Sequence, residues 1–318
     1  MTEMQRIAVD CGHGFCKGIA EHHPPLMWPS WIAPADIIPE TGMTVRSTTP
    51  ERIAWGQEPE QAYWIGSDAG RMTTSLFSRD KAQDRLTRDL TLLMTGHLTQ
   101  AVWNDGPVAL AVGLPLSWYG SHHRALAEAL TGSGQINHHR LIVARVHVFP
   151  QSVAAVMHLL TPQSVPGLYG VIDIGYRTTD YVLIDVTADH RLRLAPEPSG
   201  TWEVGMHQVN AALARHIATM WQVEFAPHEL DGQSTITVRG TSQSLEALRQ
   251  PLVHQWRDSL MTRVQTAWGP ILPRLQACLI IGGAAPLLHG AQIGTMPVTI
   301  PAEPQWANVQ GYLAAMPR

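Results

Sequence analysis

Cysteine is scarce in this sequence, and the arrangement of the few cysteines excludes two classes of scaffold. The 318 residues include three cysteines, and none of them has the Cys-x-x-Cys spacing of a structural zinc site. An odd number in a chain of this length does not support a disulfide framework either. We therefore expect Cys11, Cys16 and Cys278 to be small buried hydrophobic residues.

A surplus of basic charge is also lacking. Lysine and arginine number 22 against 26 aspartates and glutamates, which gives a formal net charge of −4 at pH 7. Without a basic field, direct binding to nucleic acid or to an anionic membrane surface is not expected. The sixteen histidines include three adjacent pairs, but neighbouring side chains point in different directions on a helix or a strand. We expect no metal site from them.

Long apolar runs are absent from the sequence as well. No stretch approaches the roughly 18 residues needed to span a bilayer. The first ten residues, MTEMQRIAVD, contain no apolar core of a secretory signal. We therefore expect a cytoplasmic protein without a membrane partner.

The length predicts two lobes. We place lobe I at residues 1–160, with an inserted small subdomain at about residues 24–80 that is rich in proline, tryptophan and glycine. Lobe II covers residues 161–318. A terminal helix at about residues 306–316 is expected to pack back on lobe I.

Strands and helices alternate along the chain, which predicts an α/β fold. Buried strands are expected at residues 6–9, 108–112, 141–149, 169–174 and 278–281. Helices are expected at residues 80–101, 121–130, 151–160, 205–222 and 244–267, and those at 80–101, 205–222 and 244–267 are amphipathic. The order strand, Asp-x-Gly turn and strand occurs at residues 6–20 and again at residues 169–186, which indicates a duplicated architecture.

The first of these turns carries residues suited to binding a phosphate. Its glycines, Gly12 and Gly14, allow backbone N–H groups to approach phosphate oxygens. Asp10 ends the strand and can hold hydrated Mg²⁺, while Lys17 supplies a positive charge. An ordinary glycine-containing hairpin turn explains the same residues, so this loop alone leaves both readings open.

The second turn offers a similar set of groups. Asp173 and Asp180 enclose Gly175 and two threonines, again between two strands. Side chains of Asp and Thr often only satisfy backbone groups of a turn. Two matching turns in one chain nevertheless favour a polyphosphate held with its metal from both sides.

The two loops together resemble the phosphate motifs of the actin-like ATPase superfamily. Residues 10–17, DCGHGFCK, look like the first phosphate motif of actin, and residues 173–180, DIGYRTTD, look like the second motif of ParM/StbA-type plasmid-segregation proteins. Further similarity lies at residues 113–115, 150–152, 282–283 and 308–312. The resemblance implies the actin/Hsp70/sugar-kinase-like fold, with two lobes, a duplicated core and a nucleotide cleft.

The resemblance also implies roles for particular positions. Asp10 and Asp173 lie near Mg²⁺ and its waters, and Gln151 positions the attacking water, which makes these three the catalytic residues. The nucleotide, ATP or GTP, is expected to contact the following residues: Gly12, His13, Gly14, Phe15, Lys17, Gly175, Tyr176, Arg177, Thr178, Gly205, Gly282 and Gly283. Tyr176 and Arg177 depart from the small, glycine-rich residues that much of the superfamily has there.

Gln151 helps to discriminate between functions within this superfamily. Sugar kinases commonly place an aspartate near this position to accept the proton of the acceptor hydroxyl, and a glutamine cannot act as that base. The sequence thus favours an ATPase that hydrolyses slowly and polymerises into filaments for plasmid or DNA segregation, with a DNA-binding adaptor as partner. The alternatives are a small-molecule kinase of the same fold and a non-catalytic nucleotide-binding scaffold. A plain helix start after Pro150 also explains Gln151.

Overall fold

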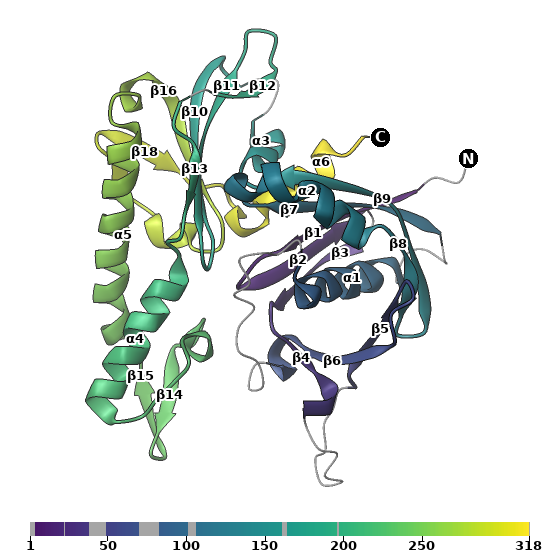
Figure 1. The fold of residues 1–318 in the computed structure, drawn as a ribbon. Helices are drawn as coiled ribbons and strands as arrows, with labels where there is room; N and C mark the ends of the chain where they lie inside the picture. The colour runs from purple at the N-terminus through teal and green to yellow at the C-terminus, as the bar shows by residue number, and fades with distance from the viewer. Residues whose placement is uncertain are drawn as a thin grey trace. The chain divides into compact units, whose positions relative to one another are not determined.

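The computed structural model describes residues 4–21, 23–37, 49–69, 83–100, 106–160, 164–195 and 197–317. The chain forms two compact units: Met1–His158 with Trp306–Arg318, and Leu159–Gln305 (Figure 1). Both units contain β-sheets covered by helices, which confirms the α/β prediction. Among the described helices, none is both long enough and apolar enough to cross a bilayer.

The first unit is built on one large sheet. Its strand order is β3-β2-β1-β7-β9-β8-β5-β6-β4. The strands are β1 (Gln5–Cys11), β2 (Phe15–Ala20), β3 (His23–Pro29), β4 (Ile32–Pro34), β5 (Glu51–Trp55), β6 (Gln61–Ile65), β7 (Pro107–Leu114), β8 (Gly132–Ile136) and β9 (His139–Pro150). The helices are α1 (Arg85–Gln100), α2 (Leu116–Leu130), α3 (Val153–Leu159) and α6 (Ala307–Ala315), with short 3₁₀ turns η1 (Ala35–Ile37), η2 (Gly66–Asp68) and η6 (Pro304–Trp306).

Strands β1 and β7 are largely buried on both faces, and their side chains alternate between two cores. In β7, Leu110 and Val112 join the larger core, to which α1 and α2 contribute leucines. Ala109 and Ala111 point to the other face, where they pack with Tyr312 of α6. Because successive strand residues face opposite sides, large residues fill one core and alanines leave room for α6 on the other.

The second unit repeats this plan with a smaller sheet. Its strand order is β12-β11-β10-β16-β18-β17, and β13 pairs with β11. The strands are β10 (Gly167–Ile174), β11 (Thr179–Val186), β12 (Leu192–Leu194), β13 (Gly200–Trp202), β16 (Leu275–Ile281), β17 (Gln292–Ile293) and β18 (Met296–Thr299), with a separate hairpin of β14 (Thr235–Val238) and β15 (Thr241–Ser244). The helices are α4 (Met206–Trp221) and α5 (Glu246–Trp268), with 3₁₀ turns η3 (Pro227–Leu230), η4 (Leu272–Arg274) and η5 (Ala285–Leu288).

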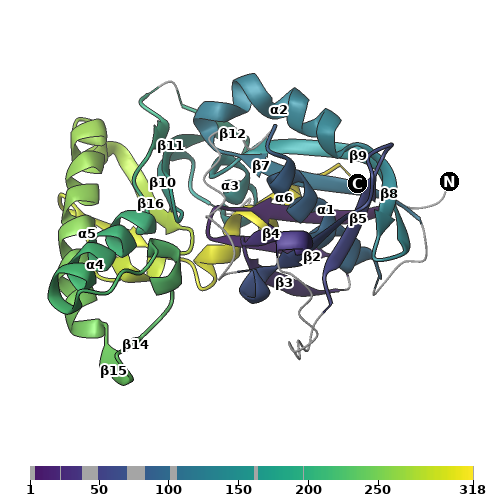
Figure 2. The ribbon, with the colours of Figure 1, turned by 60° about the horizontal axis from the view of Figure 1, so that its bottom comes forward.

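Helix α5 supplies much of the core of the second unit. Leu260, Val264 and Trp268 are fully buried against strands β10, β11 and β16. The Trp268 indole donates a hydrogen bond to the Pro198 carbonyl at 2.9 Å, so its polar atom is satisfied inside the core. Helix α4 lies beside α5 and covers the β14–β15 hairpin (Figures 1 and 2).

Five strands follow the same order in the two sheets, which confirms the predicted duplicated core. In the first unit, β3, β2 and β1 form an antiparallel meander, and β7 and β9 then add in parallel. In the second unit, β12, β11 and β10 form the meander, and β16 and β18 add in parallel. In both units the predicted turn joins the second meander strand to the innermost one.

Two neighbouring elements of the first unit are among those that differ from the sequence prediction. Helix α2 begins at Leu116 rather than at residue 121, because Pro115 takes the capping position and its fixed φ suits a helix start. Strand β8 follows at once, in a segment where the sequence analysis expected no strand. It pairs with β9 and connects β5, β6 and β4 to the main sheet. The subdomain expected at residues 24–80 remains a prediction, since residues 38–48 and 70–80 lie outside the described residues.

Candidate functional site

The first predicted loop brings an aspartate and a lysine together at the ends of β1 and β2. Asp10 and Lys17 lie opposite each other in the antiparallel register. The Lys17 ammonium contacts Asp10 Oδ2 at 2.9 Å, and both side chains are buried. Burying two charges is costly unless they are paired, so the hairpin register and the ion pair support each other.

Gln151 reaches the same aspartate from a distant part of the sequence. It follows the last residue of β9, and its Nε2 donates a hydrogen bond to Asp10 Oδ1 at 3.0 Å. Its backbone N–H donates to the Leu114 carbonyl at the end of β7, at 2.8 Å. The carboxyl ends of parallel strands meet at one edge of a sheet, which is why β1, β7 and β9 place these groups side by side.

These three side chains form a buried polar cluster within the first unit. Asp10 Oδ2 contacts the Lys17 ammonium, and Asp10 Oδ1 accepts the Gln151 amide. Among the residues that the structure describes, no three His, Cys, Asp or Glu side chains are grouped to hold a metal ion.

The remaining residues of the first loop form a tight turn. The Gly12 N–H donates to the carbonyls of Asp10 and Phe15, at 3.1 and 3.0 Å, and Phe15 begins β2. The Gly14 carbonyl accepts from the Ser30 N–H at 2.9 Å. His13 is buried and meets the ring of Trp118 edge-on, with ring centroids 6.4 Å apart.

The second loop has the same register in its own unit. Asp173 and Asp180 lie opposite each other across β10 and β11, and both are buried. The Gly175 N–H closes the turn on the Thr178 carbonyl at 2.9 Å. Thr201 donates its hydroxyl to Asp180 Oδ1, so Asp180 is held by β13. Asp173 is therefore the acid of this loop that corresponds in position to Asp10.

The start of α4 packs directly on this second loop. The His207 N–H donates to the Tyr176 carbonyl at 2.8 Å, and Nδ1 of the same histidine lies 3.1 Å from that oxygen. The Met206 N–H donates to the Gly175 carbonyl at 3.4 Å. These first amides of α4 are thus bound by loop carbonyls, which satisfies helix-end donors that otherwise lack partners.

Gly205 permits this close packing. A Cβ atom at Gly205 would lie 2.5 Å from the Tyr176 carbonyl oxygen and 2.7 Å from the Arg177 carbonyl carbon. Both are backbone atoms, so a side chain there must push the loop away from α4. The structure thus gives Gly205 a packing role beside the predicted nucleotide contact.

We expect Gly205→Ala to destabilise the second unit by about 1–3 kcal/mol, the usual cost of overpacking. Gly283→Ala is the matched control, because the nearest atom to its Cβ would be 3.9 Å away. Urea unfolding without nucleotide measures both variants. Equal stability of the two variants would contradict a packing role for Gly205.

The predicted Gly282–Gly283 turn lies against the second loop. Gly282 has a φ of +91°, and a Cβ there would lie 2.5 Å from Asp173 Oδ1 and 2.4 Å from the Ile174 carbonyl oxygen. Its N–H donates to the Pro304 carbonyl at 2.8 Å. A positive φ and this crowding both require glycine. The turn after β16 is therefore fixed beside Asp173.

Burial changes the acidity of two groups in this region. Burial raises the pKa of the Tyr176 hydroxyl to about 12. Burial also lowers the pKa of His207, which favours the neutral imidazole. Arg177 is buried as well, with Nη2 3.8 Å from Glu203 Oε1. Arg177 is therefore the cationic side chain of the second loop.

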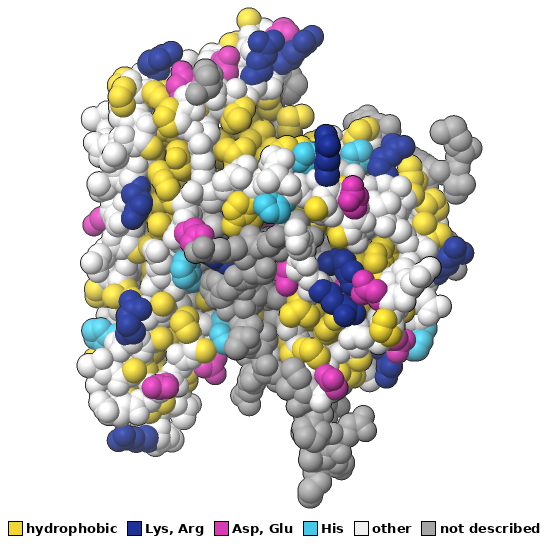
Figure 3. Space-filling view, viewed as in Figure 1, with side chains coloured by type: hydrophobic (Ala, Val, Ile, Leu, Met, Phe, Trp, Pro, Cys, Tyr) yellow, Lys and Arg dark blue, Asp and Glu magenta, His cyan; other side chains and the backbone are white. Residues whose placement is uncertain are grey.

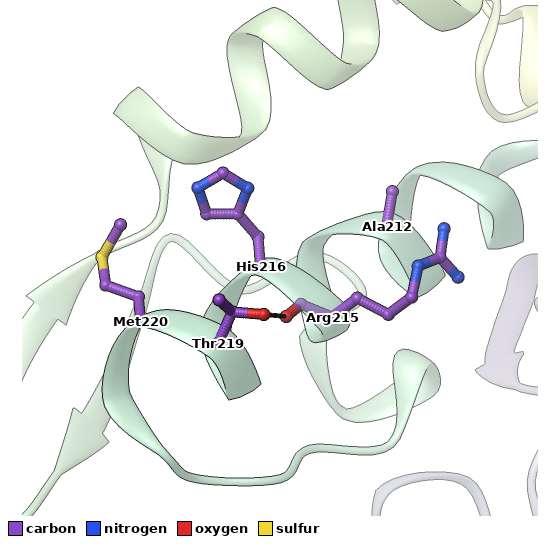
Figure 4. A pocket seen from close by; sticks show the side chains of 5 residues that line it. All are labelled: Ala212, Arg215, His216, Thr219 and Met220. Atoms are coloured by element: carbon purple, nitrogen blue, oxygen red, sulfur yellow. Dashed lines mark hydrogen bonds between the residues drawn. The ribbon is translucent and has the colours of Figure 1, made fainter.

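A separate hollow of about 490 Å³ lies on the later turns of α4 (Figure 4). It is lined by Ala212, Arg215, His216, Thr219 and Met220. At 1.5 Å per residue, the lining residues lie between about 8 and about 20 Å along the helix from His207. The loop residues described above are not among those that line this hollow, and we assign the candidate site to the loops.

The structure gathers the predicted residues into one cluster in each unit. The first holds residues 10–17 and Gln151, and the second holds residues 173–178, Gly205, Gly282 and Gly283. Trp118 and His207 contact these clusters but were not among the predicted site residues. The predicted helix start at residue 205 could have indicated that His207 lies near the second loop. Nothing in the local sequence indicates that Trp118 contacts the first loop.

Two family models match the chain, one in each half. Residues 8–153 match the model for actin like proteins, N terminal domain. Residues 171–291 match the model for the archaeal actin homologue MreB-like, C-terminal. The two models together span most of the chain, and each includes one of the two loops.

Individual relatives agree with the models. An archaeal actin homolog of Thermoplasma acidophilum is 26% identical over 246 residues, which cover 70% of this chain and 74% of the relative. A ParM filament from Clostridium botulinum superposes with a TM-score of 0.81 at 20% identity, over 98% of both chains. An archaeal actin homolog in complex with ADP gives a TM-score of 0.76 at 19% identity, over 98% of this chain and 99% of that one.

Proposed function

Because the chain belongs to the actin-like proteins and shares the fold of ParM and of archaeal actin homologues, we propose that it binds ATP with Mg²⁺, hydrolyses it slowly and polymerises. Segregation of a plasmid or other DNA is the cellular role that we propose for the filament. ATP is proposed over GTP as the nucleotide to test first.

The observation that carries this proposal is the buried cluster of Asp10, Lys17 and Gln151. A structural hairpin needs no buried ion pair at its turn, and removing two charges from water is costly. At this one point, the cation suits a phosphate, the carboxylate suits its metal, and the amide suits a water molecule. The glycines of both loops let a phosphate approach the backbone. The residues present therefore fit ATP with its Mg²⁺.

Each of these residues has a proposed task. Lys17 binds phosphate oxygens, and Asp10 and Asp173 hold the waters of Mg²⁺. Gln151 orients the attacking water through its amide, which cannot itself remove the proton. Gly282 and Gly283 contact the adenosine. Bound Mg²⁺ supplies positive charge that stabilises the negative charge developing on the transferred phosphoryl group.

Filament formation is supported by the relatives rather than by a surface feature. One solved neighbour is a ParM filament, and this chain covers 98% of its subunit. Figure 3 shows acidic and basic side chains interspersed on the visible face, without a continuous basic stripe. With a net charge of −4, we propose that DNA is reached through a DNA-binding adaptor and that the filament works in the cytoplasm.

The alternative of a nucleotide-binding scaffold without turnover is favoured by one observation. The Tyr176 carbonyl accepts the His207 N–H and lies 3.1 Å from Nδ1 of that histidine, and Tyr176 places a bulky ring in this loop. Failure of Asp173→Ala to change either nucleotide affinity or turnover would support this alternative.

We expect purified protein with ATP and Mg²⁺ to release phosphate and to increase light scattering, with filaments visible by electron microscopy. GTP in place of ATP tests the nucleotide preference. Phosphate release without an acceptor substrate would count against a small-molecule kinase. No polymer at any protein concentration would overturn the filament proposal, and no phosphate release would overturn hydrolysis.

A further inference from the structure

The turn that carries Gln151 has an unusual backbone. Ser152 is fully buried and has a φ of +65°, a region that residues other than glycine rarely occupy. The Val153 N–H donates to the Gln151 carbonyl at 2.7 Å across it, which makes a γ-turn of the rare kind with positive φ. Such a conformation persists only where the surroundings hold it.

A side chain from the far end of the sequence holds this turn. The Ser152 N–H donates to Oδ1 of Asn308 at 2.9 Å, and the bond is buried. Asn308 is the second residue of α6, 156 positions further along the chain. An acceptor at this point satisfies an amide that burial would otherwise leave without a partner.

Helix α6 is itself fixed in the first unit at several points. A Cβ at Gly311 would lie 2.2 Å from the Ala154 carbonyl oxygen, so the helix touches the backbone of α3. A Cβ at Gly113 would lie 1.8 Å from the Tyr312 hydroxyl. Arg6 donates hydrogen bonds to the carbonyls of Leu313 and Met316 at the end of the helix. The Asn308 side chain therefore has a fixed position relative to the turn.

We infer that Asn308 is a positioning residue, which holds the Gln151–Ser152 turn in its left-handed form and so directs the Gln151 amide to Asp10. The inference rests on the proposed function for the role of Gln151 in hydrolysis. The hydrogen bond that holds the turn can be tested independently of activity. Helix α6 thereby acts on the site without touching the nucleotide.

We expect Asn308→Ala to lower kcat for ATP hydrolysis about tenfold, with KM for ATP within about twofold of wild type, because a small displacement of a positioning group reduces turnover strongly. Adding Ser152→Gly should restore most of this loss, since glycine adopts a positive φ without strain. The Ser152 hydroxyl has no hydrogen-bond partner among the described residues, so its removal costs no such bond. Gln310→Ala, in the same helix, is the control and should leave kcat unchanged.

Amide hydrogen exchange at Ser152 provides the second readout. We expect exchange at least about tenfold faster in Asn308→Ala than in wild type. An active wild type with unchanged kcat in Asn308→Ala would overturn the inference, as would a double variant that stays as slow as the single one. If the wild type itself releases no phosphate, the proposed function fails. The inference about the turn is still tested in that case, because unchanged amide exchange at Ser152 in Asn308→Ala would overturn it.

Discussion

Replacing Gln151 with leucine is expected to lower kcat for ATP hydrolysis about 100-fold while nucleotide affinity stays within about threefold. Leucine fills a similar volume but has no amide to orient a water molecule. Asp10 keeps its contact with Lys17, at 2.9 Å, so the binding charges remain in place. An effect confined to kcat is what removal of a group acting only in the transition state produces.

Single-turnover phosphate release and equilibrium binding of a fluorescent ATP analogue measure the two quantities. Gln151→Asn is a useful companion, because it retains the amide but is one methylene shorter, and it should lose activity to a similar degree. Gln250→Leu, on an exposed position of α5, is the control for the substitution itself. A Gln151→Leu enzyme with wild-type kcat would remove Gln151 from the mechanism.

Most of the fold could be predicted because its signals are local. The apolar run at residues 108–112 and the repeated strand, Asp-x-Gly turn and strand are properties of short segments. Strand β8 was missed because Gly132, Ser133 and Gly134 provide little β propensity. Its pairing with β9 and β5 depends instead on the neighbouring strands. Tertiary contacts therefore determine that this segment forms a strand.

In the candidate site too, some contacts follow from the local sequence and others do not. The ion pair of Asp10 and Lys17 follows from hairpin register, since two residues equally far from a turn lie opposite each other. The contact of Gln151 with Asp10 spans 141 positions and was not predicted, although the family resemblance had assigned both residues to the site. Nothing local indicates that Asn308 reaches Ser152, because the glycines that admit α6 look like ordinary glycines in the sequence.

The second large effect is expected from Lys17→Met, which should destabilise the first unit by about 3–5 kcal/mol. The substitution leaves the Asp10 carboxylate buried without its cation, and side-chain exposures of 10% and 4% leave little water to screen it. Arg52→Met is the matched control. Its ion pair with Glu60 is just as short, at 2.7 Å, but both side chains are nearly half exposed. This control should cost at most about 1 kcal/mol.

The double variant Asp10→Asn with Lys17→Met separates two contributions to the free energy of unfolding. One is the cost of an unpaired buried charge, and the other is the net contribution of the intact ion pair. Because it removes both charges, the double variant should be more stable than Lys17→Met alone. Urea unfolding of wild type, Lys17→Met, Arg52→Met and the double variant measures this. A loss in Lys17→Met no larger than in Arg52→Met would show that water reaches Asp10 and that the pair is not electrostatically buried. A double variant more stable than wild type would show that this ion pair costs free energy that the hairpin does not need. Such a cost is consistent with our proposal that Lys17 binds phosphate.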